Sequence, residues 1–278
     1  LTASGIYGGI VARRMGIPSI LNVHTVLSKS HIVGKRTTRY LELLARSLNR
    51  ILIAGNQMTE AELGRLRLWR DRSKIRMIYN GIAPVGEFRS NAFGQNAIKI
   101  TMVANYFPEK DQLTLIKAYE LLKGRYPLRL LMIAEGEGAC RDQVMHYIAE
   151  KELREIVFQK NKSDDTYTHQ TDIFVLTTHS EGDPIVLKEA MSVGIPCVAS
   201  RVGAVGEVID DGVDGMLVGD GDLDGLVQAL VHLIEDHKYR EALSQKAIEK
   251  YKSKFTLEKM TREYEVLYAE VTGIQDAQ

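Results

Sequence analysis

Residues 173–200 have the sequence IFVLTTHSEGDPIVLKEAMSVGIPCVAS. Apolar runs, turn signals containing Gly and Pro, and a helical pattern alternate in this segment, as in the βαβ units of a parallel sheet. Glu181 and Glu189 stand eight positions apart on either side of the expected helix start, where free backbone N–H groups hold a phosphate well. A carboxylate pair beside an anion site indicates a ligand with both hydroxyls and phosphates. The expected elements are a strand at 173–176, a helix at 185–193 and a strand at 196–199.

The rest of the chain repeats this alternation of short apolar runs and helical patterns. Residues 84–96 lack periodicity and follow Asn-Gly and Pro signals, so a domain junction is expected there. The sequence therefore predicts an α/β protein with two doubly wound units in tandem. Further strands are expected at 17–23, 50–54, 75–79, 98–103, 129–133 and 156–158, and helices at 37–48, 57–68, 112–122 and 140–151.

The C-terminal part is expected to be helical. The predicted helices are 223–235, a short one near 239–251, and a last one from about 256 to 271. The predicted domains are 1–83 and 84–255, and residues 256–278 are expected to pack back toward the N-terminal part.

Composition limits the class of protein. The chain has 278 residues, of which 45% are hydrophobic and 26% charged, which suffices for one large or two moderate domains. Cys140 and Cys197 give neither a metal spacing nor a disulfide framework, which favours a reducing compartment. No membrane-length apolar stretch or signal-peptide pattern is present, so a cytoplasmic location is expected. The chain begins at Leu1 without a methionine, which indicates a fragment.

Charge is unevenly distributed although the formal net charge is zero. Residues 1–83 contain fourteen Lys or Arg and four Asp or Glu, so 14 − 4 = +10. This surplus predicts contact with an anionic partner, such as the inner face of a membrane or a phosphorylated acceptor. The alternative is that these side chains simply lie on solvated helix faces. No nucleic-acid partner is expected.

Several short motifs follow one another in the segments 78–82, 105–110, 133–138, 172–176, 181–191, 203–207 and 211–215. Their order resembles that of the retaining GT-B glycosyltransferases of family 4, also called group 1. The resemblance implies two Rossmann-like domains, with a sugar nucleotide held mainly by the C-terminal one. On this reading the N-terminal domain is incomplete, because its usual opening strands and glycine-rich loop have no counterpart here.

The resemblance also implies catalytic residues. Glu181 matches the family glutamate near the transferred sugar, and Lys110 matches the lysine that neutralises the diphosphate as charge develops on it. His24, after the expected strand at 17–23, matches a histidine beside the sugar. Taken without the family, His24 fits a packed or capping residue better, and Lys110 fits a solvated loop lysine.

Donor binding is expected from the loops around these residues. By resemblance, Glu189 accepts hydrogen bonds from ribose hydroxyls, and backbone groups near the start of the helix face the diphosphate and sugar. Asn105 stands where the family usually has arginine, so one phosphate-binding cation is missing. The expected donor-binding residues are Asn105, Gly136, Gly182, Asp183, Ile185, Val186 and Glu189.

The implied reaction is glycosyl transfer from a nucleoside diphosphate sugar to the hydroxyl of a carbohydrate or lipid-linked acceptor, with retention at the anomeric carbon. UDP sugars and polysaccharide biosynthesis are the expected context, and neither a metal nor a cofactor is expected. Two alternatives stay open: a non-catalytic nucleotide-sugar-binding module or inactive fragment, and a GT-B epimerase acting on a free sugar nucleotide. The sequence identifies neither the sugar, the base nor the acceptor.

Overall fold

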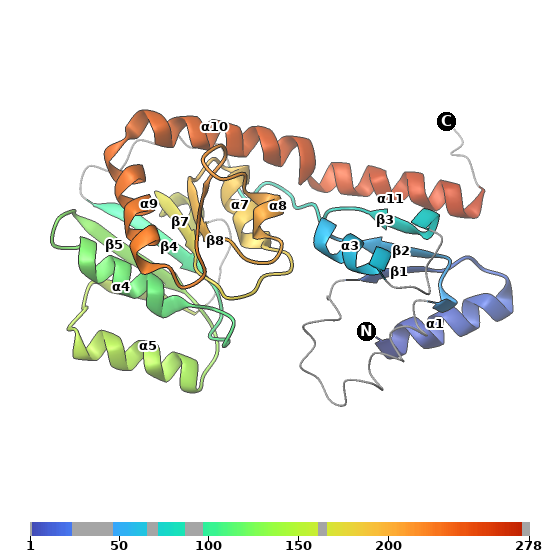
Figure 1. Cartoon of the computed structure of the whole chain (residues 1–278), viewed down its shortest axis with the longest axis horizontal. Helices are drawn as coiled ribbons and strands as arrows, with labels where there is room; N and C mark the ends of the chain where they lie inside the picture. Colours follow the sequence, from blue (N-terminus) through green and yellow to red (C-terminus); the bar gives the residue numbers. More distant parts are fainter. Residues whose placement is uncertain (1, 24–46, 66–71, 87–96, 161–165, 274–278) are drawn as a thin grey trace. The chain divides into compact units, whose positions relative to one another are not determined.

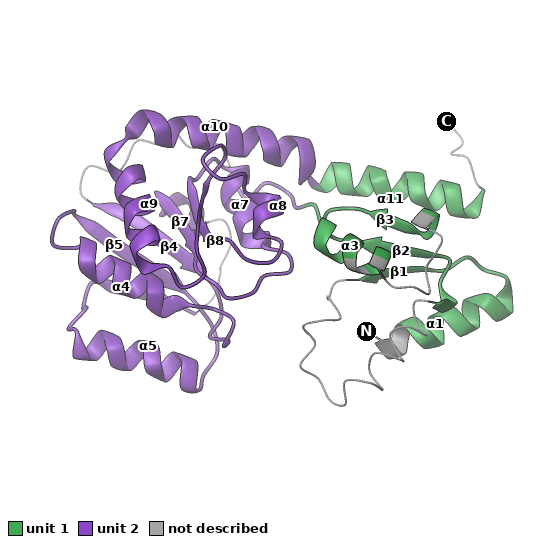
Figure 2. Cartoon of the chain, in the orientation of Figure 1, with its two compact units in different colours: residues 1–81, 257–278 green, residues 82–256 purple. Residues whose placement is uncertain are grey.

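The computed structural model describes residues 2–23, 47–65, 72–86, 97–160 and 166–273. The chain divides into two compact units (Figure 2). Unit 1 comprises Leu1–Gly81 and Leu257–Gln278, and unit 2 comprises Ile82–Thr256. The chain therefore passes between the units twice, after Gly81 and after Thr256, close to the boundaries predicted at 83/84 and 255/256.

Unit 1 is built on a parallel three-stranded sheet in the order β1-β2-β3. The strands expected at 17–23, 50–54 and 75–79 are present with shorter bounds. The helix expected at 57–68 is present as α3 up to Arg65, and its last three expected positions lie outside the described residues. The helix expected at 37–48 lies outside the described residues except for positions 47 and 48. The elements are α1 (Thr2–Met15), β1 (Ile20–Val23), β2 (Ile51–Ala54), α3 (Gln57–Arg65), η2 (Arg72–Lys74), β3 (Ile75–Met77) and α11 (Leu257–Thr272).

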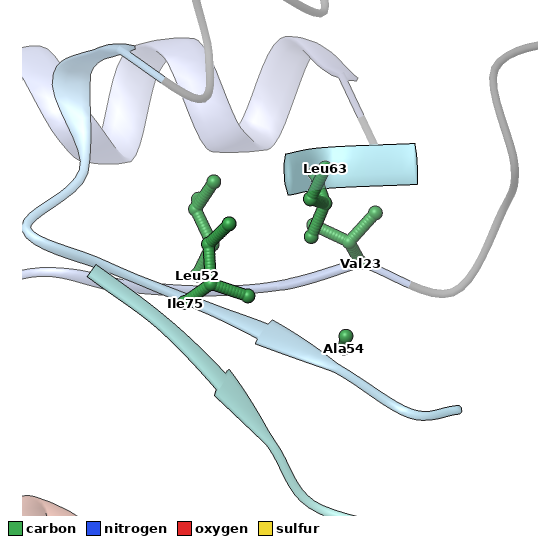
Figure 3. Packing of buried hydrophobic residues seen from close by; sticks show 5 residues of the cluster. All are labelled: Val23, Leu52, Ala54, Leu63 and Ile75. Carbon is green, nitrogen blue, oxygen red and sulfur yellow. The ribbon is translucent and has the colours of Figure 1, made fainter. Parts of the chain in front are cut away.

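The central strand β2 is buried on both faces of this sheet. Alternate residues of a strand point to opposite faces, so its apolar side chains join two separate clusters. One cluster, shown in Figure 3, consists of Val23, Leu52, Ala54, Leu63 and Ile75. The other consists of Ile51, Ile53, Ile78, Leu267 and Val271, the last two from α11.

Helix α11 is held on the sheet of unit 1 mainly by its apolar face. Leu267 and Val271 are buried, and burying each contributes roughly 1.5–3 kcal/mol. The Asn22 amide also donates to the Tyr264 hydroxyl at 2.8 Å. Arg76 pairs with Glu270 at 2.6 Å, but the two side chains are 34% and 53% exposed, so solvent screens this ion pair and it adds little.

Unit 2 contains a six-stranded, all-parallel sheet in the order β6-β5-β4-β7-β8-β9. Helix α4 packs beside α9 and α7 beside α10 (Figure 1). The strands are β4 (Ile98–Val103), β5 (Leu128–Ile133), β6 (Ile156–Gln159), β7 (Ile173–Leu176), β8 (Cys197–Ser200) and β9 (Met216–Val218). The helices are α4 (Gln112–Leu122), α5 (Ala139–Glu150), α6 (Thr166–His169), α7 (Ile185–Ser192), α8 (Val205–Val208), α9 (Leu223–Glu235) and α10 (His237–Lys254).

The predicted α/β class with parallel sheets is confirmed, but one helix differs from its prediction. The short helix expected near 239–251 is α10, which has 18 residues. It starts earlier because the Asp236 carboxylate accepts the Tyr239 N–H at 2.9 Å and caps its N-terminus. It continues further because lysines occupy its last turn, where they complement the helix dipole. In the described part of the chain, no helix is long and apolar enough to cross a membrane.

Candidate active site

Strands β4 and β7 lie side by side at the centre of the six-stranded sheet. From β4 the chain continues to β5 and β6 on one side, and from β7 to β8 and β9 on the other. Open α/β sheets bind ligands beyond the carboxyl ends of their strands, at the point where the winding direction reverses. The loops that follow β4 and β7, together with helix α7, carry eight of the ten predicted site residues, so the topology brings these eight to this point.

The two loops are bonded to each other. Lys110 and Thr178 form an isolated antiparallel bridge, and the Thr178 hydroxyl donates to the Glu109 carbonyl at 2.8 Å. The Asp111 N–H donates to the Thr177 carbonyl at 3.2 Å, and the Thr177 hydroxyl donates back to the Asp111 carbonyl at 2.6 Å. These bonds fix the backbone on either side of Lys110 relative to the end of β7.

Lys110 and Glu181, both predicted to be catalytic, are in direct contact. The Lys110 Nζ donates to Glu181 Oε2 in an ion pair whose side chains are only 19% and 15% exposed. The other carboxylate oxygen, Oε1, accepts the Gly182 N–H at 3.2 Å. The ammonium and the carboxylate are therefore held together in a largely but not fully desolvated position, where each acts on a ligand more strongly than in bulk water.

The backbone of Glu181 is fixed by a glycine from the loop after β8. Gly203 has φ +51°, and a Cβ placed on it would lie 2.0 Å from the Glu181 carbonyl oxygen. The next residue, Ala204, donates its N–H to that same oxygen at 3.0 Å. Only glycine fits this approach, because any side chain would push the Glu181 loop away.

Asn105 ties the loop after β4 to the loop after β5. Its Oδ1 accepts the Glu135 N–H at 3.0 Å, and the Tyr106 N–H donates to the Glu135 carbonyl at 3.0 Å. The buried Gln112 amide donates to the Asn105 carbonyl, also at 3.0 Å. Gly136, with φ +108°, lies against Tyr106. Asn105 and Gly136 therefore lie together, and the Asn105 side-chain oxygen is used to hold this loop pair.

Three backbone bonds shape the start of α7. The Ile185 N–H donates to the Asp183 carbonyl at 2.9 Å, and the Leu187 and Lys188 N–H groups donate to the Pro184 carbonyl at 3.0 and 3.4 Å. The Val186 N–H takes part in none of these bonds. The Ile185 N–H, which was predicted to face the donor, therefore already donates to a carbonyl within the turn.

Glu189 is buried inside α7 and is bound by a residue that the sequence did not single out. The hydroxyl of Tyr167, from α6, donates to Glu189 Oε2 at 3.0 Å, and both side chains are buried. The Tyr167 carbonyl also accepts the Thr171 hydroxyl at 2.7 Å, and Thr171 Oγ1 lies 2.8 Å from Thr101 Oγ1, on β4. Tyr167 therefore orients the Glu189 carboxylate, and Thr171 and Thr101 in turn connect Tyr167 to the central strand β4. A lone tyrosine in a polar segment of the sequence gives no sign of this role.

Two further predictions concern histidine and metal. His24 lies outside the described residues. Within the residues that the structure does describe, no group of three or more His, Cys, Asp or Glu side chains could hold a metal ion.

Another histidine lies in the loop after β7. The His179 ring lies 2.6 Å from the Asp220 carboxylate, and this hydrogen bond raises the pKa of His179.

Comparison with known proteins decides the family. Residues 87–250, more than half of the chain, match the family described as glycosyl transferases group 1. The chain belongs to this family. The chain is 26% identical over 288 residues to the UDP-Gal:alpha-D-GlcNAc-diphosphoundecaprenol alpha-1,3-galactosyltransferase of Escherichia coli, covering 96% of this chain and 73% of that protein.

The family assignment agrees with the fold. HepE of Anabaena, solved with UDP and glucose, superposes with a TM-score of 0.83 at 18% identity, covering 97% of this chain and 76% of HepE. Sucrose-phosphate synthase of Thermosynechococcus elongatus gives a TM-score of 0.80 at 18% identity, covering 98% of this chain and 72% of that one. This group 1 glycosyl transferase therefore has a GT-B type fold with Rossmann-like, parallel-sheet domains, as the sequence predicted.

Proposed function

We propose that this chain transfers a glycosyl residue from a nucleoside diphosphate sugar to an acceptor hydroxyl, with retention of the anomeric configuration. The contact between Lys110 and Glu181 at the point where the sheet reverses its winding carries this proposal. It supplies a cation and an anion, side by side, at the place where open α/β sheets hold ligands.

The donor is proposed to lie with its diphosphate near the start of α7. The helix dipole and the Val186 N–H favour an anion there, and Lys110 adds a full positive charge. Glu181 accepts a hydrogen bond from the transferred sugar, and Glu189 accepts bonds from the ribose hydroxyls. A carboxylate that binds a diol in this way fixes its orientation as well as its position.

The chemical step breaks the bond between the anomeric carbon and the diphosphate oxygen, and forms the bond to the acceptor oxygen on the same face. The acceptor proton passes to the departing diphosphate, which leaves with the bonding electron pair. The protein's contribution is to position the two substrates and to stabilise the charge that develops on the diphosphate. Lys110 is proposed to provide that charge stabilisation.

Two similar proteins support a choice of substrates. The Escherichia coli relative is named for a UDP-galactose donor and a diphosphoundecaprenol-linked acceptor, and HepE was solved with UDP-glucose. We therefore propose UDP sugars as donors and a lipid-linked saccharide as acceptor. A lipid-linked acceptor also agrees with the surplus of ten positive charges in residues 1–83, because basic residues are attracted to anionic lipids. Two of these basic residues, Arg13 and Arg14, are exposed at the end of α1.

The first experiment measures donor binding and turnover. UDP-glucose, UDP-galactose, UDP-N-acetylglucosamine, GDP-mannose and ADP-glucose are tested for a rise in melting temperature, which binding to the native state produces. UDP release is then followed with undecaprenol-linked acceptors, and the anomeric configuration of the product is determined by NMR. Inversion at the anomeric carbon would refute retention.

The same experiment separates the alternatives. Saturable binding without product, unaltered in Glu181→Ala, would identify a nucleotide-sugar-binding module. Interconversion of donor sugars in the absence of any acceptor would identify an epimerase. If no sugar nucleotide raises the melting temperature, the proposed donor site is wrong.

Membrane contact through residues 1–83 is tested separately. The chain is sedimented with vesicles containing anionic phosphatidylglycerol, at low and at high salt, with neutral vesicles as the control. An electrostatic contact weakens as salt screens the charges, so binding is expected only at low salt and only to anionic vesicles. Equal sedimentation with both kinds of vesicle would refute it.

A further inference from the structure

Lys188 is a charged residue in the interior of unit 2. It lies in the middle of α7, directly before Glu189, and its side chain has 0% exposure. A lysine ammonium at such a position is normally excluded from a protein core unless it has a fixed partner. Its contacts include the Asp183 carboxylate and the Phe255 ring, which come from different segments.

The first contact closes the loop that precedes α7. Lys188 Nζ donates to Asp183 Oδ1, so the side chain reaches back over the first turn of its own helix. Asp183 stands two residues after Glu181, and its carbonyl accepts the Ile185 N–H. The ion pair therefore ties the Asp183 side chain, within the segment 181–185, to the middle of α7.

The second contact leads to the points where the chain enters and leaves unit 2. Lys188 Nζ lies 5.2 Å from the centre of the Phe255 ring, a geometry in which a cation is attracted to the ring face. The Phe255 carbonyl accepts the Ile82 N–H at 2.9 Å, and the Tyr251 hydroxyl donates to the Ile82 carbonyl at 2.8 Å. Ile82 also forms a bridge with Thr256. The first and last residues of unit 2 are thus bonded to each other beside the residue that contacts Lys188.

A buried ion pair of this kind is a poor device for stability. Desolvating both groups offsets most of their attraction, and apolar replacements of similar volume are often neutral or stabilising. Its effect is to favour one conformation, because an arrangement that separates Lys188 from Asp183 loses an ion pair at a lysine side chain with 0% exposure. The conformation that it selects here is that of the loop between Glu181 and the start of α7.

We infer that Lys188 is a positioning residue of the donor site: it holds the Asp183 loop in the conformation that receives the diphosphate, and it links that loop to the paired chain crossings at Ile82 and Phe255. The inference rests on the proposed function for the identity of the ligand, but not for the loop itself. It explains why a lysine occupies a position that packing alone would assign to an apolar residue.

The test uses the full chain and the variant Lys188→Met, which removes the charge and keeps a side chain of comparable length. Hydrogen–deuterium exchange of peptides covering 181–187 is measured without ligand, and the Kd for UDP is measured by calorimetry. We expect loop exchange to rise roughly tenfold as the segment opens locally. The Kd is expected to rise roughly 10- to 100-fold, because small misplacements of binding groups are costly.

Three further variants sharpen the result. Ile248→Val, in α10, is a mild core change outside the loop and is expected to leave both loop exchange and the Kd unchanged. Phe255→Leu keeps an apolar side chain and is expected to change both quantities in the same direction as Lys188→Met, but less. In Asp183→Asn combined with Lys188→Met, the effects are expected to be non-additive, because both changes break one contact.

The outcomes are distinct. Wild-type loop exchange and wild-type UDP affinity in Lys188→Met would overturn the inference and leave the proposed function standing. Unchanged exchange in Phe255→Leu would overturn the link to the chain crossings. Faster loop exchange in Lys188→Met, in a protein whose wild type binds no sugar nucleotide, would support the positioning role and refute the proposed function instead.

Discussion

Two lysine–carboxylate contacts in unit 2 use the same chemistry in different places. Lys110 and Glu181 come from the loops after β4 and β7, and their side chains are 19% and 15% exposed. Lys250, from α10, lies 2.9 Å from Asp210 Oδ2 and 3.1 Å from Asp214 Oδ2. Lys250 and Asp214 are more deeply buried, at 7% and 3% exposure. Depth of burial alone would therefore favour the second contact as the functional one.

The partners of each contact lead to the opposite conclusion. Asp214 also accepts the Asp210 N–H at 2.8 Å, so its oxygens hold the turn between α8 and β9 to α10. Lys110 and Glu181 instead lie at the reversal of the sheet, on loops that other bonds already fix. Structural ion-pair networks also occur in buried positions, so the place of a contact in the topology is the better guide to a functional site.

Protonation behaviour agrees with a structural role for the Lys250 cluster. Burial raises the pKa of Asp214, whereas the hydrogen bond from Lys250 lowers the pKa of its neighbour Asp210. Burial likewise raises the pKa of the Cys197 thiol, and Asp214 adds to that shift. Burial and Asp214 therefore both favour the neutral form of this thiol, and the surroundings of Asp214 form part of the core.

The largest expected effect is on stability, in Lys250→Met. This change leaves the buried Asp214 carboxylate without its cation, and breaking a buried pair in this way costs about 3–5 kcal/mol. Urea unfolding is expected to show that loss, with the affinity for UDP unchanged under conditions where the variant is folded. The matched control is Lys246→Met, in the same helix, whose ion pair with Glu249 is largely exposed and is expected to contribute almost nothing. Equal losses in the two variants would contradict the structural role of Lys250.

The same substitution at Lys110 is expected to affect catalysis. If Lys110 stabilises charge on the departing diphosphate, Lys110→Met lowers kcat about 10²- to 10³-fold, as the loss of one such donor does. The melting temperature is expected to stay near that of the wild type, because the pair is partly hydrated and the loop has other bonds. Turnover with the best UDP sugar, measured at saturating donor, checks this. A variant that loses stability but keeps its kcat would reverse the comparison between the two lysines.

The sequence predicted the parts of this arrangement that depend on local pattern. The bounds of β4, α4, β7 and α9 agree with those expected, because strong periodicity and clear turn signals delimit these elements. The short helices α6 and α8, with four residues each, and the three-residue strand β9 were not predicted, since such lengths show no period. Helix α1 was also missed, and its three glycines lower its helix propensity.

The site was predictable to the extent that its residues lie on motifs. The contact between Lys110 and Glu181 joins two loops that the motifs already marked. Tyr167 and Lys188 could not be found in this way, because their partners Glu189 and Phe255 become neighbours only when the sheet and helices have packed. A tyrosine before a strand and a lysine in a helix are ordinary surface residues in a one-dimensional pattern. Their burial is a tertiary property.

The smallest effect concerns a third contact, at the edge of the loop after β7. The hydrogen bond to Asp220 raises the pKa of His179 above 6.5, burial opposes this shift, and the charge of Asp111 adds to it. A histidine whose folded pKa exceeds its unfolded value contributes stability that is complete below the unfolded pKa, and that is lost as pH rises through the folded pKa. The melting temperature of the wild type is therefore expected to exceed that of Asp220→Asn most clearly below pH 6.5.

Both side chains of this pair are about half exposed, at 49% and 50%, so solvent and salt screen the interaction and the difference is expected to be small. Melting temperatures of the two proteins, measured from about pH 5 to pH 9 at low salt, are expected to converge as His179 deprotonates. Asp222→Asn controls for the loss of one negative charge. Like Asp220, Asp222 lies between β9 and α9, but its carboxylate caps α9 instead of contacting His179. If the difference between wild type and Asp220→Asn stays constant across this range, it does not depend on the protonation of His179, and the pair is then not an ionic contact like that of Lys110 and Glu181.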